Sequence, residues 1–153
     1  MIFELNGRSI EVEVEPTVTV LELLRGELGI TSVKKGCEQG ECGACTVLLD
    51  GAPVTSCILL ARQVDGHRVT TIEGLEENPL MKELREAFLR NGAVQCGFCT
   101  PGMLLAAYAL LKESRKPTME EVKIGIEGNI CRCTGYVKII EAILDAAEEI
   151  APE

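Results

Sequence analysis

The chain has 153 residues, enough for one domain of average size or two small ones. Hydrophobic residues make up 46% of it, which excludes a disordered protein, and the longest nearly apolar run, Met103 to Leu111, is too short to span a bilayer. The formal net charge of −9 argues against nucleic acid or an anionic membrane as the main partner. We therefore expect a soluble globular protein.

The cysteine content is the unusual feature of the composition. Eight cysteines are about 5% of the chain, below the roughly 8–10% typical of small disulfide scaffolds. The stretch Met1 to Gly7 carries no basic region, apolar core or cleavage site of a signal peptide, so we expect a cytoplasmic location. In a reducing compartment such thiols serve as metal ligands or redox groups more often than as structural bridges.

Residues 1–75 carry the signals of short strands and one helix. We expect a hairpin over residues 1–14 with its turn at Asn6-Gly7, and then a helix that is capped by Thr19 and Glu22. The apolar stripe of this helix consists of Val20, Leu23, Leu24 and Leu28. A second hairpin is expected to pair 46–49 with 54–58 around Asp50-Gly51, and a strand over 69–72 is expected to follow a turn at Asp65-Gly66. Residues 33–45 have no usable periodicity and contain three glycines, which predicts a loop.

Residues 76–153 change to a helical pattern. We expect four helices: one that starts at Asn78-Pro79, one from Thr100-Pro101 to about Ser114, one after a capping box at Thr118 to Glu121, and one from Tyr136 to about Ile150 with Ile140, Ile143, Leu144 and Ala147 on its inner face. The predicted fold class is α+β, with one domain over 1–75 and a second over 76–153.

Four of the cysteines form a quartet in the first half. Cys37, Cys42 and Cys45 have C-x4-C-x2-C spacing, and Cys57 follows after eleven residues, a pattern typical of plant-type [2Fe–2S] sites. Three thiolates from nine consecutive residues converge only on an irregular loop, where the glycines allow unusual dihedral angles and let backbone N–H groups approach sulfur. With Cys57 on the return strand of the hairpin, we expect all four thiols to meet.

The other four cysteines form a second quartet, with Cys96-x2-Cys99 and Cys131-x-Cys133. Each pair stands just before a predicted helix, whose N-terminus would direct its positive dipole end toward an anionic group, and Arg132 adds a cation. A second cluster and a structural zinc site both fit this spacing. Four disulfides or a thioredoxin-type pair at Cys96 and Cys99 fit less well, because neither an export signal nor a βαβ pattern is present.

Three other residues are expected to play no part in these sites. His67 adjoins the turn at Asp65-Gly66 and is expected at the surface. Tyr108 and Tyr136 are interpreted as helix-packing residues.

Three stretches carry a resemblance to a known family. They are Gly36-Cys37-Glu38-Gln39-Gly40-Glu41-Cys42-Gly43-Ala44-Cys45-Thr46-Val47, Gln95-Cys96-Gly97-Phe98-Cys99-Thr100-Pro101-Gly102 and Gly128-Asn129-Ile130-Cys131-Arg132-Cys133-Thr134-Gly135-Tyr136. In this order and over nearly the whole chain, they resemble the signature stretches of the iron–sulfur subunit of molybdenum hydroxylases. That family includes xanthine dehydrogenase, aldehyde oxidoreductase, carbon monoxide dehydrogenase, nicotinate dehydrogenase and 4-hydroxybenzoyl-CoA reductase.

The resemblance implies a fold and a set of ligands. It implies an N-terminal plant-ferredoxin-like β-grasp domain followed by a C-terminal four-helix bundle, each holding one [2Fe–2S] cluster. The implied ligands are Cys37, Cys42, Cys45 and Cys57 for the first cluster and Cys96, Cys99, Cys131 and Cys133 for the second.

The resemblance also implies partners. These are a large subunit that carries molybdopterin and a medium subunit that carries FAD, in a heterotrimer or a dimer of heterotrimers. This chain would relay single electrons between molybdenum and FAD and would perform no substrate chemistry itself. By motif position, Gln95 and Cys133 are the candidates for contact with the molybdopterin.

Two rival functions come from other classes. An independent ferredoxin that diffuses between partners needs only the first domain and leaves the helical half unexplained. A zinc-stabilised interaction module would be colourless, whereas iron–sulfur clusters absorb visible light.

Overall fold

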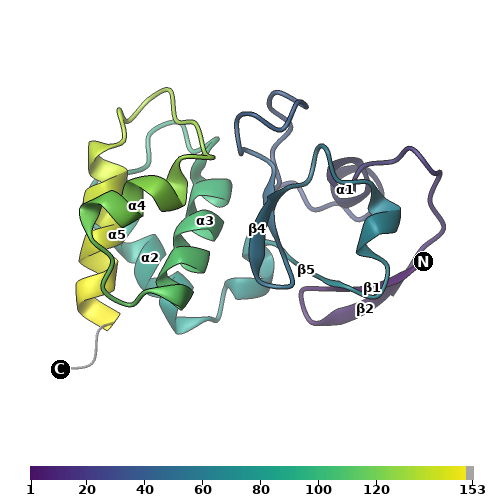
Figure 1. Ribbon diagram of the computed structural model, residues 1–153, viewed down its shortest axis with the longest axis horizontal. Coiled ribbons are helices and arrows are strands. Elements are labelled where there is room, and N and C mark those ends of the chain that lie inside the picture. Colours follow the sequence, from purple (N-terminus) through teal and green to yellow (C-terminus); the bar gives the residue numbers. More distant parts are fainter. Residues whose placement is uncertain (151–153) are drawn as a thin grey trace.

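The computed structural model describes residues 1–150. Figure 1 shows two parts side by side, a strand-rich part built by the N-terminal half of the chain and a helical part built by the C-terminal half. Each part has its own cluster of buried apolar side chains. Within residues 1–150, no helix combines the length and the apolar character needed to cross a membrane.

The N-terminal part contains one mixed sheet of five short strands. These are β1 (Ile2–Leu5), β2 (Arg8–Glu11), β3 (Thr46–Leu49), β4 (Ala52–Thr55) and β5 (Arg68–Thr70), in the order β2-β1-β5-β3-β4. The pair of β1 and β5 is parallel and the other pairs are antiparallel. Both predicted hairpin turns are present, and all four of their residues, at Asn6-Gly7 and Asp50-Gly51, have positive φ.

The N-terminal helix begins as predicted and continues differently. Thr19 and Glu22 form the expected capping box at the start of α1 (Val20–Glu22), which runs into a π-helical turn, η1 (Leu23–Glu27). The N–H of Leu28 donates to the carbonyl of Leu23 there. Because a π turn departs from the 3.6-residue period, Leu28 is only partly buried, although it was expected within the apolar stripe.

Three strand predictions were too long at their C-terminal ends. β2 ends at Glu11 rather than 14, β4 ends at Thr55 rather than 58, and β5 ends at Thr70 rather than 72. Two unpredicted 3-10 helices follow the strands, η2 (Ala61–Val64) and η3 (Ile72–Leu75). The chain turns away from the sheet at these points, so the apolar residues that suggested longer strands contribute to helical turns and loops.

The C-terminal part contains the four predicted helices. They are α2 (Pro79–Arg90), α3 (Thr100–Glu113), α4 (Met119–Ile126) and α5 (Val137–Ile150), and Asn78 and Thr118 cap α2 and α4 as predicted. The buried face of α5 consists of Ile139, Ala142, Ile143, Ala146 and Ala147. Ile140 and Leu144 are only partly buried, because α5 packs against both α2 and α4 and its buried arc is centred between them.

The two parts meet along α3. This helix contacts β3 and β4 on one side and α2 and α4 on the other, and Figure 1 shows it beside β4. Eight of its fourteen residues are buried, which is typical of a helix enclosed on several sides. Leu48 of β3 belongs to the buried cluster of the helical part, so the two halves share a packed face. The observed α+β architecture confirms the predicted fold class.

Candidate functional site

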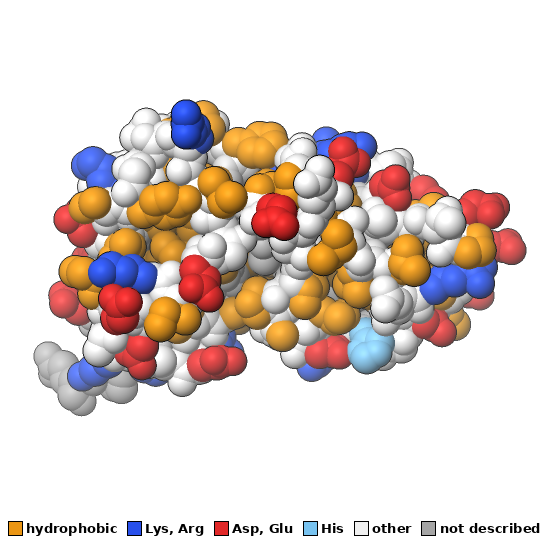
Figure 2. All heavy atoms as spheres, turned by 45° about the horizontal axis from the view of Figure 1, so that its top comes forward, with side chains coloured by type: hydrophobic (Ala, Val, Ile, Leu, Met, Phe, Trp, Pro, Cys, Tyr) orange, Lys and Arg blue, Asp and Glu red, His pale blue; other side chains and the backbone are white. Residues whose placement is uncertain are grey.

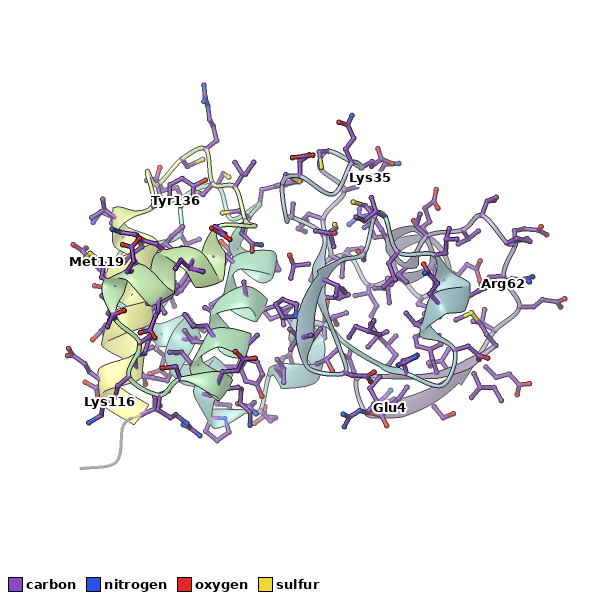
Figure 3. All side chains as sticks on the ribbon, in the orientation of Figure 1. Glu4, Lys35, Arg62, Lys116, Met119 and Tyr136 are labelled. Atoms are coloured by element: carbon purple, nitrogen blue, oxygen red, sulfur yellow. The ribbon has the colours of Figure 1, made fainter. Side chains whose placement is uncertain are left out.

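The eight cysteines lie in loops at one end of the molecule, where the strand-rich and helical parts face each other. Figure 3 shows sulfur atoms near the labelled Lys35 and Tyr136, on the two loops that approach across the junction. All eight are free thiols in residues 1–150. The two quartets predicted from the spacing therefore come from neighbouring loops of a single surface.

The first quartet is built around Cys37. Its Sγ accepts hydrogen bonds from the backbone N–H groups of Gln39, Glu41 and Cys42 at 3.3, 3.4 and 3.4 Å. Glu38 and Gly40 have positive φ, and these left-handed residues direct the N–H groups toward the sulfur. These hydrogen bonds lower the pKa of the Cys37 thiol to about 7, and the bond from Gln39 has the largest effect. The lowered pKa favours the thiolate, which is the form that binds metal.

The glycines of this loop have different roles. Gly40 and Gly43 have positive φ, as the sequence predicted. The φ of Gly36 is not positive, but a Cβ at this position would lie 2.8 Å from Cys42 Sγ. A side chain at Gly36 would therefore displace a candidate ligand.

Cys45 and Cys57 form the buried side of the first quartet, with exposed fractions of 2% and 8%. Their side chains are in contact, and burial raises the pKa of Cys57 to about 11. The prediction that Cys57 lies on the return strand was wrong, because β4 ends two residues earlier. Ser56 returns the chain to this point instead, since its N–H and its hydroxyl both donate to the carbonyl of Cys45.

In the second quartet, each cysteine of the Cys96-x2-Cys99 motif contacts one cysteine of the Cys131-x-Cys133 motif. Cys96 contacts Cys133, and both are exposed, while Cys99 contacts the buried Cys131. Burial raises the pKa of Cys99 to about 12. Cys99 is also the N-cap residue of α3, so the positive end of this helix dipole faces the quartet as predicted.

The thiols of each quartet lie in contacting pairs. Within residues 1–150, no three His, Cys, Asp or Glu side chains converge closely enough to hold one ion. The thiols meet in pairs, Cys37 with Cys42 and Cys45 with Cys57 in the first quartet, and the two crossed pairs in the second. Two pairs of thiols in each quartet fit a group with two irons and four cysteine ligands.

A mostly apolar cavity of about 310 Å³ separates the quartets. All four cysteines of the second quartet line it, together with Cys37 and Cys42 of the first. Phe98 and Ile130 also line it and are about half exposed. Figure 2, in which this end of the molecule is turned toward the viewer, shows hydrophobic side chains distributed over the face.

A buried asparagine connects the two cysteine loops. Asn129 is 6% exposed, and its Nδ2 donates to the carbonyl of Gly43 at 3.0 Å and to Thr46 Oγ1 at 3.1 Å. The next residue, Ile130, donates its N–H to the carbonyl of Cys42 at 2.9 Å. Asn129 stands in the third signature stretch, but its role in joining the loops was not predicted from the sequence.

Tyr136 was interpreted from sequence as a helix-packing residue, and this interpretation was incomplete. Its ring packs against the helical core, but its hydroxyl accepts a hydrogen bond from the N–H of Cys131 at 2.9 Å. Gln95 and Cys133, the candidates for a pterin contact, are both exposed beside this loop. His67 is exposed and pairs with Asp50 at the surface, as predicted.

Comparisons with known proteins identify two iron–sulfur families along the chain. Residues 3–71 match the family described as 2Fe-2S iron-sulfur cluster binding domain, and residues 71–144 match the [2Fe-2S] binding domain family. The chain is 50% identical to the nicotinate dehydrogenase small FeS subunit of Eubacterium barkeri, over 96% of this chain and 94% of that protein. It is 46% identical to the xanthine dehydrogenase iron-sulfur-binding subunit of Escherichia coli O157:H7, over 92% and 89%.

Solved structures give the same relationship. A chain of quinoline 2-oxidoreductase from Pseudomonas putida 86 superimposes with a TM-score of 0.91 and 45% identity, covering 97% of this chain and 93% of that chain. Aldehyde oxidoreductase from Desulfovibrio gigas gives 0.90 and 41%, over 97% of this chain and 17% of that chain. The chain therefore belongs to the family of small iron–sulfur subunits of molybdenum hydroxylases, the [2Fe–2S]-binding components of oxidoreductase complexes.

Proposed function

We propose that this chain relays single electrons between a molybdenum centre and FAD, both held by partner subunits, through two [2Fe–2S] clusters. The observation that carries the proposal is the presence of two complete cysteine quartets on loops that contact each other directly. Each cluster, when bound, accepts and releases one electron. The chain supplies the thiolates, the hydrogen bonds to sulfur and the rigid junction between the loops.

The contacts between thiols support a specific set of ligands. Cys37 and Cys42 would bind one iron of the first cluster, and Cys45 and Cys57 the other. In the second cluster, Cys96 with Cys133 and Cys99 with Cys131 would divide the irons in the same way. The N–H donors around Cys37 and the dipole of α3 at Cys99 both favour the negative charge that such clusters bring.

The proposal includes two domains, residues 1–75 and 76–153, with one cluster each. The separate buried clusters of the two halves support the division, although Leu48 packs across it. Because α3 is buried against the sheet, the two domains would act as one body in the complex.

The proposed partners are a large molybdopterin-binding subunit and a medium FAD-binding subunit, in a heterotrimer or a dimer of heterotrimers in the cytoplasm. The exposed side of the second quartet supports a partner there, because Cys96 and Cys133 lie open beside the half-exposed Phe98 and Ile130. Gln95 is exposed at the same place, which supports Gln95 and Cys133 as the contacts to the pterin.

The cluster content tests the proposal directly. Protein isolated without oxygen should contain about four irons and about four acid-labile sulfides per chain, and reduction should give two distinct paramagnetic signals. A colourless zinc protein, or a protein with two irons, would contradict it.

Two matched variants test the ligand assignment. Cys42→Ser should abolish the signal of one cluster and spare the other, and Cys99→Ser should do the reverse. Loss of both signals from either variant, with the fold retained by circular dichroism, would mean that the quartets form one shared site. Isolation of the tagged chain from its host should also recover molybdenum and FAD in stable association.

A further inference from the structure

Three hydrogen bonds form a closed ring within the loop that precedes α5. The hydroxyl of Thr134 donates to Cys131 Sγ at 3.1 Å, the N–H of Tyr136 donates to Thr134 Oγ1 at 3.2 Å, and the N–H of Cys131 donates to the hydroxyl of Tyr136 at 2.9 Å. The ring fixes both the backbone of Cys131 and the direction of the Thr134 side chain. Figure 3 labels Tyr136 in this loop.

The ring also determines where the proton of Thr134 points. A hydroxyl has one proton to donate, and its oxygen already accepts the N–H of Tyr136. A thiolate sulfur can only accept, so the hydroxyl proton lies between Thr134 Oγ1 and Cys131 Sγ. Within residues 1–150, this is the one hydrogen bond from a side-chain hydroxyl to a cysteine sulfur.

The backbone at Tyr136 gives an independent reason to regard the ring as a maintained feature. Tyr136 has a φ of +71°, a left-handed conformation that is costly for a bulky side chain. Asn6 and Asp50, which also have positive φ, stand in hairpin turns, where these residue types are common. In its strained conformation, Tyr136 places its N–H on Thr134 and its hydroxyl on the N–H of Cys131.

We propose that Thr134 tunes the second cluster, its hydrogen bond to Cys131 Sγ raising the reduction potential of that cluster without affecting the first. The inference rests on the proposed role of Cys131 as a cluster ligand. Reduction adds one electron and changes no proton or covalent bond, and part of the added negative charge falls on the cysteine sulfurs. A donor to Cys131 Sγ stabilises the more negative state, so it favours reduction.

Comparison with the first quartet shows why the hydrogen bond to Cys131 Sγ can be changed by substitution. Cys37 Sγ receives its hydrogen bonds from backbone N–H groups, which no side-chain substitution removes. The bond to Cys131 Sγ comes from a side chain, so a single substitution removes it, together with the bond from the N–H of Tyr136 to the same hydroxyl oxygen. Thr134 is therefore a positioning and tuning residue that carries no substrate chemistry.

The test is a potentiometric titration of the complete protein with both clusters, reduced with dithionite and followed by electron paramagnetic resonance. Thr134→Val keeps the shape of the side chain and removes the hydroxyl. At a fixed potential near the midpoint, we expect the ratio of reduced to oxidised second cluster to fall between about threefold and tenfold, where tenfold corresponds to 59 mV for a one-electron couple. Thr134→Ser should retain the wild-type ratio, and the signal of the first cluster should not shift.

Two further measurements separate tuning from a structural role. Tyr136→Phe removes a hydroxyl from the same ring without removing the donor to Cys131 Sγ, so it should shift the potential less than Thr134→Val. Proton couplings of the reduced second cluster that disappear in deuterium oxide should include one that Thr134→Val lacks. If the valine variant fails to take up the second cluster, Thr134→Ala, which adds no volume, carries the same test.

The proposal is overturned if the potential is unchanged in a variant that lacks the hydroxyl, if Thr134→Ser shifts as far as Thr134→Val, or if both clusters shift together. Absence of the second signal from the wild-type protein would instead refute the proposed function. The two failures are therefore distinguishable.

Discussion

Gly102 lies at a close contact between the two halves of the protein, and it offers a sharp test of the junction. A Cβ at this position would lie 2.5 Å from the carbonyl oxygen of Gly43 and 3.2 Å from Asn129 Nδ2. The φ of Gly102 is outside the left-handed region, so alanine fits its backbone conformation. Gly102→Ala therefore changes the volume at the junction and little else.

Two opposing effects decide whether this substitution raises or lowers the stability of the protein. Gly102 is the third residue of α3, where alanine gains up to about 1 kcal/mol in helix propensity. The clash opposes this gain by about 3 kcal/mol, the upper end for an overpacked site, because the atom in the way is a backbone carbonyl that cannot rotate aside. The net loss of about 2 kcal/mol predicts a fall in Tm of about 4–8 °C for a chain of this size.

Gly26→Ala is the matched control for Gly102→Ala. A Cβ at Gly26, in the π turn of the N-terminal part, meets no atom within 4 Å, and its φ is also outside the left-handed region. Alanine there should be neutral or should raise the stability by up to about 1 kcal/mol. Thermal unfolding of the cluster-loaded protein, followed by far-ultraviolet circular dichroism and by loss of visible absorbance, measures both. The predicted clash is contradicted if the Gly102→Ala protein unfolds at or above the wild-type temperature, or if the Gly26→Ala protein loses as much stability.

Two other positions give predictions of different kinds. A hydrogen bond with His67 and one from the N–H of Arg68 hold the pKa of Asp50 below its usual value. The contribution of Asp50 to stability is therefore present above its unfolded-state pKa and is lost as pH falls through its folded-state pKa. Asp50→Asn should lower the Tm at neutral pH, with a difference that shrinks below about pH 5; a difference independent of pH would contradict this. Asn129→Ala removes two buried hydrogen bonds and should cost about 2 kcal/mol in urea unfolding, and Asn129→Asp, which lacks the amide donor, should not restore the loss.

The features predicted correctly from sequence depend on residues close together in the chain. The capping boxes at Thr19 and Thr118 close over three residues, and the hairpin turn at Asp50-Gly51 uses two adjacent residues with positive φ. Such interactions are specified by local chemistry, so a pattern in the sequence is sufficient evidence for them. The absence of periodicity and the three glycines likewise predicted that residues 33–45 form a loop, and the structure confirms it.

The features that were missed depend on contacts between distant segments. Asn129 bonds to Gly43, 86 residues away, and its place in the third signature stretch does not reveal this partner. The pairing of Cys96 with Cys133 arises from the approach of two loops, whereas spacing only assigns both to one quartet. The early end of β4 follows from the tertiary path, because Ser56 must turn back to the carbonyl of Cys45.

The two quartets differ in the source of the hydrogen bonds to their sulfur atoms, which is the backbone at Cys37 and a side chain at Cys131. The hydrogen bonds to Cys37 come from a loop whose shape depends on positive φ at Glu38 and Gly40, so altering them requires a different backbone. The bond to Cys131 depends on one hydroxyl, that of Thr134. Removing the donor to Cys131 Sγ therefore needs only a side-chain substitution, whereas removing the donors to Cys37 Sγ puts the course of that loop at risk.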